Sequence, residues 1–266
     1  QGQRLVTPGA AAWTGRTRAA GALRLLHAVL PLLHPLLPWL LSFPVAALWL
    51  ASDARLRRAL RRDARRFGVA DPCYALRRVA SFGRILAERQ IVRAQPSRYR
   101  LHVRGGAHLR AALAAGRGCV VLSAHVGNWE LGAAWLPALT QRAIHAVRVR
   151  ADAATTIAAE RAAAGHARIV EHDPRDGVRA TVAVVRALRA GAIACLMGDR
   201  ALPGQPVARV PCCGAPLPVP LGPFQIAARA GVAALPIFLV RTAPGAYVLD
   251  IGSPLAGPDE IGRAHV

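Results

Sequence analysis

The sequence predicts an α/β fold in which a mainly parallel or mixed sheet is flanked by helices and preceded by an N-terminal hydrophobic membrane-anchor helical segment. Two observations support this prediction. From residue 99 onward, short apolar runs alternate with alanine-rich helical runs at the spacing of β–α units. Before that point, residues 25–52 contain no Asp, Glu, Lys or Arg, which indicates a separate hydrophobic segment.

The individual elements follow from these runs. Each apolar run predicts a strand, and we expect strands at 99–105, 119–125, 144–151, 167–172, 192–199, 233–241 and 246–252. Helices are expected at 73–92, 107–115, 128–140, 153–165, 178–190 and 221–231. Asn128 is a typical N-cap residue and should begin the helix after the second strand. We expect one domain boundary, near residue 70, between an anchor with its basic helix (1–70) and an α/β domain (71–260).

The uncharged run at 25–52 is long enough to span a membrane, but prolines at 31, 35, 38 and 44 argue against one straight helix. Arginines precede the run, and seven more lie between Arg55 and Arg66. Positive charge on both flanks favours a kinked hairpin or an interfacial anchor that returns to the cytoplasmic face. A single span and a buried helical hairpin of a soluble protein are the alternatives.

The charge balance predicts an anionic partner. The chain carries 35 basic and 14 acidic residues, a formal net charge of +21. Nucleic acid, an acidic membrane surface and an acidic carrier protein all fit such an excess. The aromatic content of 5% and the long uncharged run argue against nucleic acid. The five cysteines form no CxxC pair and no histidines complete a metal-ligand spacing, so we expect no metal site.

Both ends of the chain suggest a fragment. The sequence starts at Gln1 with neither an initiator methionine nor a secretory signal pattern. It ends in IGRAHV at 261–266, and one back-translation of this string resembles a widely used short-read sequencing adapter. We therefore expect residues 261–266 not to pack against the domain.

Polar residues follow two of the predicted strands, where an open α/β sheet places its ligand site. His125 ends the second strand, and Glu130 falls in the first turn of the next helix. Across a strand-to-helix turn these two side chains can meet, as a base and an acid that orients it. Asp199 and Arg200 follow the strand at 192–199 in the same way. Arg161, in the expected helix 153–165, is a further candidate.

Each candidate also has a purely structural interpretation. His125 could be an ordinary histidine at a strand end. Glu130 could be present only because the helix dipole favours an acidic residue in the first turn. Asp199 and Arg200 could form a turn with a surface ion pair, which contributes little to the stability of the folded protein. Arg161 fits a solvent-facing position on its helix. Only the combination of these residues points to a specific site.

That combination resembles a known superfamily. His125-x4-Glu130, with Asn128 and Trp129 between them and an apolar strand before them, resembles the HX4(D/E) motif of the lysophospholipid acyltransferases. The form HVGNWE is similar to the lipid A biosynthesis (late) acyltransferase branch. The resemblance continues through Arg161, the strand GAIACLMGDR and the stretch from 210 to 241, and covers about residues 13–254.

Two departures from the family pattern concern the lipid acceptor rather than the chemistry. Cys212 and Cys213 stand before Gly214, where the family often has an aromatic pair. Arg200 follows Asp199, where lipid A enzymes often have glutamine. The superfamily also includes enzymes that acylate phosphatidylinositol mannosides, aryl polyenes and other glycolipids, so these acceptors are alternatives to a lipid A precursor.

The resemblance implies an O-acyltransferase, with residues 71–260 as its catalytic domain. It would move a fatty acyl chain from acyl carrier protein (acyl-ACP) or coenzyme A (acyl-CoA) to a hydroxyl of a lipid or glycolipid, with no cofactor. His125 would be the general base and Glu130 the acid that fixes its tautomer. Asn128, Arg161, Asp199 and Arg200 would bind substrate, the arginines through phosphate.

The implied location is the cytoplasmic face of the bacterial inner membrane, on an anionic lipid surface and without nucleic acid. A basic membrane-binding or nucleic-acid-binding protein without catalysis is the alternative from a different class.

Overall fold

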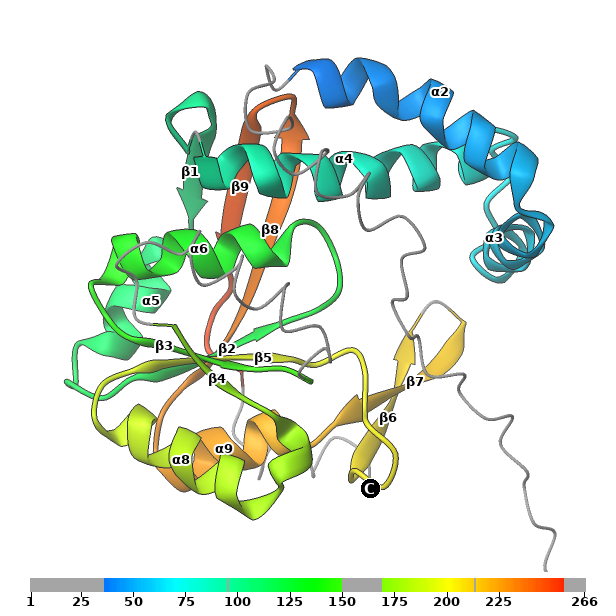
Figure 1. The fold of residues 1–266 in the computed structure, drawn as a ribbon. Coiled ribbons are helices and arrows are strands. Elements are labelled where there is room, and N and C mark those ends of the chain that lie inside the picture. The colour runs from blue at the N-terminus through cyan, green and yellow to red at the C-terminus, as the bar shows by residue number, and fades with distance from the viewer. Residues whose placement is uncertain (1–35, 95, 150–168, 213, 256–266) are drawn as a thin grey trace, which may run out of the picture.

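The computed structural model describes residues 36–94, 96–149, 169–212 and 214–255. Its centre is a seven-stranded sheet with the order β1-β9-β8-β2-β5-β3-β4 (Figure 1). The strands are β1 (Arg100–Arg104), β2 (Cys119–Ser123), β3 (Ile144–Val147), β4 (Ile169–His172), β5 (Ile193–Met197), β8 (Ala234–Ala243) and β9 (Ala246–Ile251). All neighbours are parallel except β8 and β9. The predicted α/β class and all seven predicted strands are therefore confirmed.

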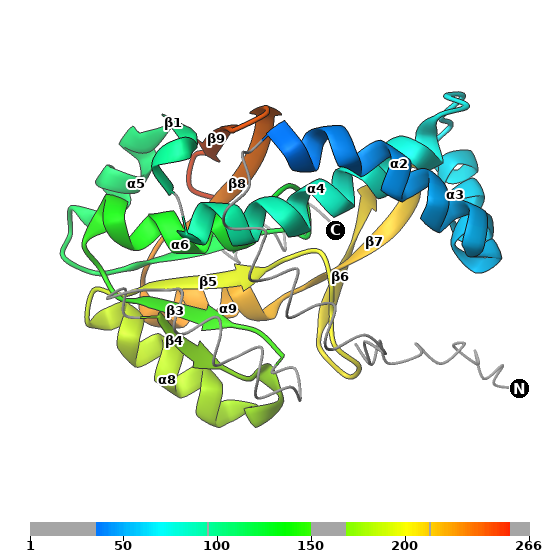
Figure 2. The same ribbon diagram turned by 45° about the horizontal axis from the view of Figure 1, so that its top comes forward.

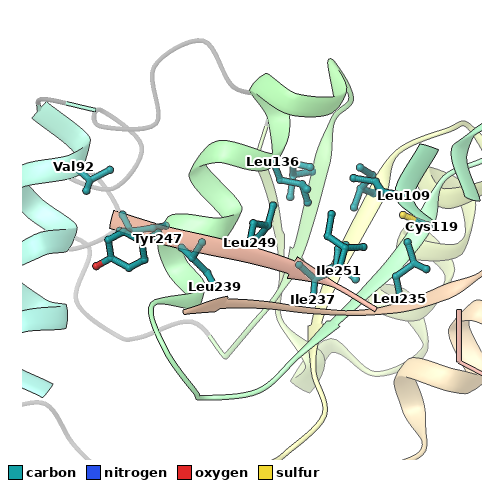
Figure 3. Close-up of a cluster of buried hydrophobic side chains, with 14 of the residues drawn as sticks. Val92, Leu109, Cys119, Leu136, Leu235, Ile237, Leu239, Tyr247, Leu249 and Ile251 are labelled. Atoms are coloured by element: carbon teal, nitrogen blue, oxygen red, sulfur yellow. The ribbon is translucent and has the colours of Figure 1, made fainter. Parts of the chain in front are cut away.

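Helices cover both faces of this sheet (Figure 1). They are α5 (Gly106–Leu113), α6 (Trp129–Thr140), α8 (Val178–Arg189) and α9 (Gly222–Ala230). Alternate residues of a strand point to opposite faces, and β2 follows this rule. Cys119 and Val121 pack in the cluster under α6, whereas Val120 packs in the cluster with α8 and α9. Figure 3 shows the first cluster, in which Leu136 of α6 lies over strands β8 and β9.

In the described part of the chain, the α-helices that precede the sheet are α2 (Leu36–Ser52), α3 (Ala54–Arg66) and α4 (Tyr74–Ala94). Figures 1 and 2 both show α2 lying along α4, where Ala46 packs with Val79 and Ala80. The chain then bends by 106° into α3. Asp53 begins α3, since its Oδ1 accepts hydrogen bonds from the backbone N–H groups of residues 55 and 56 at 2.9 Å.

None of the described helices is by itself long and apolar enough to cross a membrane. The bent pair of α2 and α3 meets the requirement together, by length and composition. The domain boundary near residue 70 stays a prediction, as does the anchor itself, whose first residues, 25–35, lie outside the described part of the chain.

A two-stranded antiparallel hairpin, β6 (Val207–Cys212) with β7 (Ala215–Pro220), was not expected from the sequence. Prolines at 211, 216, 218 and 220 argue against strands, because proline donates no ladder hydrogen bond. Both strands of a two-stranded ribbon are edge strands, however, and an edge tolerates proline where its nitrogen faces away from the partner. The helix expected at 153–165 and the tail at 261–266 lie outside the described residues.

Candidate active site

The carboxyl ends of β2 and β5 form the centre of the site. The two strands are parallel neighbours, with Ser123 opposite Met197. The backbone N–H of Gly198 donates to the carbonyl oxygen of Ser123 at 2.8 Å, which continues the pairing past the end of the strands. Because parallel strands end at the same edge of a sheet, the next residues of both segments emerge together. These residues include His125 and Asp199.

His125 is held by both oxygens of the Asp199 carboxylate. Its Nδ1 lies 2.9 Å from Oδ1, and its backbone N–H donates to Oδ2 at 3.0 Å. Burial raises the pKa of Asp199, but the hydrogen bonds from the side chain and backbone of His125 outweigh burial and bring this pKa below its ordinary value. An ionised carboxylate can only accept, so the neutral form of the ring carries its proton on Nδ1 and keeps a lone pair on Nε2. This is the tautomer that a general base requires.

The turn that carries His125 is fitted closely against β8. Gly127 has a φ of +67°, and a Cβ at this position would lie 2.1 Å from the carbonyl oxygen of Leu239. The same oxygen accepts a hydrogen bond from the backbone N–H of Asn128 at 3.0 Å. Only glycine combines this dihedral angle with so close an approach.

Asn128 occupies the N-cap position of α6, as predicted, but its side chain makes no capping hydrogen bond. The side chain is buried, and its Nδ2 donates to the hydroxyl of Tyr247 at 3.1 Å. Asn128, predicted to bind substrate, therefore contacts the protein interior and is not among the residues that line the cavity described below.

The side chains of two predicted site residues lie outside the described part of the structure. Glu130 lies in the first turn of α6, as expected, but its side chain is outside the described part of the structure. Arg161 is also outside the described residues. The predicted contact between His125 and Glu130 stays a prediction. The contact between His125 and Asp199 was not predicted, although both residues were identified as following strands.

A cavity of about 640 Å³ opens beside His125, within the range of roughly 300–1,000 Å³ that is typical of small-molecule sites. Trp129, whose ring meets the His125 ring edge-on at a centroid distance of 5.8 Å, also lines it, as does the exposed Arg200. Most of the other lining is apolar and includes Val121, Leu136, Val184, Met197, Ile226 and Leu239. The arrangement can hold a long apolar group next to a histidine base.

The chemistry of the other groups near the cavity is limited. Burial raises the pKa of Cys195, which lines the cavity, to about 12, so that its thiol is a poor nucleophile at neutral pH. Within the described parts of the chain, no three His, Cys, Asp or Glu side chains come together as metal ligands.

Comparison with known protein families finds a match. A family model described as bacterial lipid A biosynthesis acyltransferase matches residues 75–260, more than half of the chain. The match begins at the start of α4 and includes His125, Asn128, Glu130, Asp199 and Arg200. No curated protein matches the chain.

Proposed function

The chain belongs to the bacterial lipid A biosynthesis acyltransferase family, and we propose that it transfers a fatty acyl chain from an acyl thioester to a hydroxyl group of a lipid acceptor. The observation that carries this proposal is the histidine–carboxylate pair beside a largely apolar cavity. A thioester donor and a hydroxyl acceptor need a base and a place for the acyl chain, and the site offers both.

In the proposed reaction, Nε2 of His125 takes the proton of the acceptor hydroxyl as its oxygen attacks the thioester carbonyl carbon. A C–O bond forms, and the tetrahedral intermediate then expels the thiolate, which receives the proton from the imidazolium. The products are an ester and a free thiol. Asp199 holds the ring and stabilises its positive charge while the proton is in transit. No enzyme nucleophile is needed, because the acceptor oxygen attacks directly.

The apolar lining of the cavity would bind the acyl chain, with about 0.8 kcal/mol for each CH₂ group removed from water. Arg200 would bind a phosphate of the donor or acceptor. It lines the cavity, and within the described residues no carboxylate forms an ion pair with it. Arg161 stays a predicted phosphate ligand. Glu130 was predicted from the motif as the acid that fixes the His125 tautomer, and this role stays a prediction.

We also propose that α2 and α3 place the enzyme on the cytoplasmic face of an anionic membrane. One side of α2 packs on α4, whereas Leu40, Val45 and Leu48 on the helix are 65%, 60% and 74% exposed. The arginine-rich helix α3 follows directly. Exposed apolar side chains beside clustered arginines are typical of a helix that lies in the lipid interface, its cations among anionic headgroups.

The function is tested with the full chain in detergent or vesicles. Acyl-ACP and acyl-CoA are each offered with a lipid A precursor and with a phosphatidylinositol mannoside, and mass spectrometry detects the acylated product. We expect transfer with one of these donors, and its loss in His125→Ala. Turnover by His125→Ala at the wild-type rate would contradict the proposal.

A further inference from the structure

The least exposed charged side chain among the described residues belongs to Glu88 of α4, at 1%. Its Oε2 accepts hydrogen bonds from the hydroxyl of Tyr247 and from Nη1 of Arg241, the latter at 3.2 Å. A carboxylate without access to water is costly unless it is paired in this way. An apolar residue would fill the same space at no such cost, so the buried carboxylate calls for an explanation.

The hydrogen bonds of Glu88 lead to the active-site turn. Tyr247, on β9, donates to Glu88 and accepts from Nδ2 of Asn128 at 3.1 Å. Its hydroxyl therefore uses its single donor on one side and a lone pair on the other. Figure 3 shows the Tyr247 hydroxyl at the end of the buried cluster nearest α4. Helix α4, strand β9 and the turn after β2 are thus joined by one buried chain of hydrogen bonds.

We propose that Glu88 and Tyr247 are positioning residues for the acyl transfer, which act through Asn128 on the turn that carries His125. This inference rests on the proposed role of His125 as the base. Neither residue lines the cavity, so neither is placed to touch the substrate.

The reason lies in how the turn is held. Asn128 follows His125 by three residues, and its backbone N–H already bonds to Leu239. The bond to Tyr247 fixes the Asn128 side chain as well. The Oδ1 of this buried amide already lacks a hydrogen-bond partner in the described structure. Without the bond to Tyr247 the Nδ2 would lack one too, and the turn would gain by shifting toward water. A shift of His125 by even 1 Å would disturb its bonds to Asp199, and misplacement of this size reduces rates by about a hundredfold.

The chain supplies a matched control in Tyr99. This tyrosine is also buried, and its ring lies next to that of Tyr247 at a centroid distance of 6.1 Å. In the described structure its hydroxyl has no hydrogen-bond partner. Tyr99→Phe and Tyr247→Phe therefore remove the same atom from the same cluster, but only the second breaks the connection to the turn.

The experiment measures steady-state acyl transfer and thermal unfolding of the full-length variants. Tyr247→Phe should lower kcat by about ten- to a hundredfold with KM changed less than about twofold, because the lost interaction positions the base and not the substrate. Tyr99→Phe should keep the wild-type kcat. Glu88→Gln retains an acceptor for Tyr247 and should lose less activity than Glu88→Leu.

A double-mutant cycle tests the route through Asn128. If Tyr247 acts through this residue, Asn128→Ala and Tyr247→Phe should be non-additive, and the double variant should be no slower than the slower single variant. Additive losses would overturn the route, and the cycle can be run with Glu88→Leu if Tyr247→Phe fails to fold. Wild-type kcat in Tyr247→Phe, or an equal loss in Tyr99→Phe, would overturn the inference as a whole. His125→Ala separates the two levels: if it is inactive while Tyr247→Phe is fully active, only the positioning role is wrong.

Discussion

Replacing Asp199 by asparagine tests whether this carboxylate is the partner of the base. The change removes one negative charge and keeps the size of the side chain. The imidazolium of His125 forms only during the reaction, so its attraction to Asp199 lowers the barrier specifically. At a charge separation of about 4 Å this attraction is about 1 kcal/mol in water and about 4 kcal/mol at an effective dielectric constant of 20.

The exposed fractions of the two side chains, 36% for His125 and 26% for Asp199, place the pair between these limits. The barrier should therefore rise by about 1–4 kcal/mol, which corresponds to a fall in kcat of about five- to a thousandfold. Asparagine can also donate a hydrogen bond to Nδ1. That would move the ring proton to Nε2 and remove the base, so we expect the upper half of this range.

The assay is steady-state acyl transfer from acyl-ACP or acyl-CoA, with Glu130→Gln as the comparison. If Asp199 orients His125, Asp199→Asn should lose more kcat than Glu130→Gln, with little change in KM in either variant. Wild-type kcat in Asp199→Asn, together with a large loss in Glu130→Gln, would refute this reasoning. The acid predicted from the sequence motif would then be the partner of the base.

Three further predictions concern other parts of the molecule. Gly127→Ala should abolish activity and lower the Tm, because the added Cβ would lie 2.1 Å from the Leu239 carbonyl oxygen. Gly116→Ala controls for the positive φ alone, because nothing lies within 4 Å of the new atom and Gly116 does not line the cavity. Arg200→Ala should raise KM more than it lowers kcat, as measured by steady-state kinetics. Arg209→Ala is the control, and an equal loss of kcat/KM in the two variants would contradict a phosphate site at Arg200. Changing Leu40 and Leu48 to glutamine should weaken sedimentation with anionic vesicles and leave transfer to a detergent-solubilised acceptor intact; undiminished vesicle binding would argue against α2 as the contact.

The fold could be predicted from the sequence to a large extent, because its signals are local. A buried parallel strand reads as a short apolar run, such as CVVLS at 119–123, and the helices between strands read as alanine-rich runs. The hairpin of β6 and β7 escaped this reasoning because its prolines suppress the local signal. The pairing of β6 with β7 depends on two segments together, and the residues of either segment alone do not indicate it.

The site was predictable only in part, for the same physical reason. The motif identifies His125 and places Glu130 five residues later on the next helix. It contains no information on strand order, and strand order decides which side chains meet His125. Strand β2 lies between β8 and β5, and the residue that reaches the His125 ring is Asp199, which follows β5 and is 74 positions along the chain. Knowing that His125 and Asp199 each follow a strand does not reveal that the two strands are neighbours in the sheet.

The motif itself gains a physical explanation when its residues are assigned to the strands that surround it. His125 is held by the Asp199 carboxylate, which follows β5 and orients the proposed base. Gly127 is required by the approach of the turn to the Leu239 carbonyl oxygen on β8. Asn128, which reads as a helix cap, gives up the capping bond for a buried one to Tyr247 on β9. Each of these residues thus contacts a residue on, or just after, a different strand. The short sequence HVGNWE is therefore constrained by the packing of this edge of the sheet as well as by the reaction.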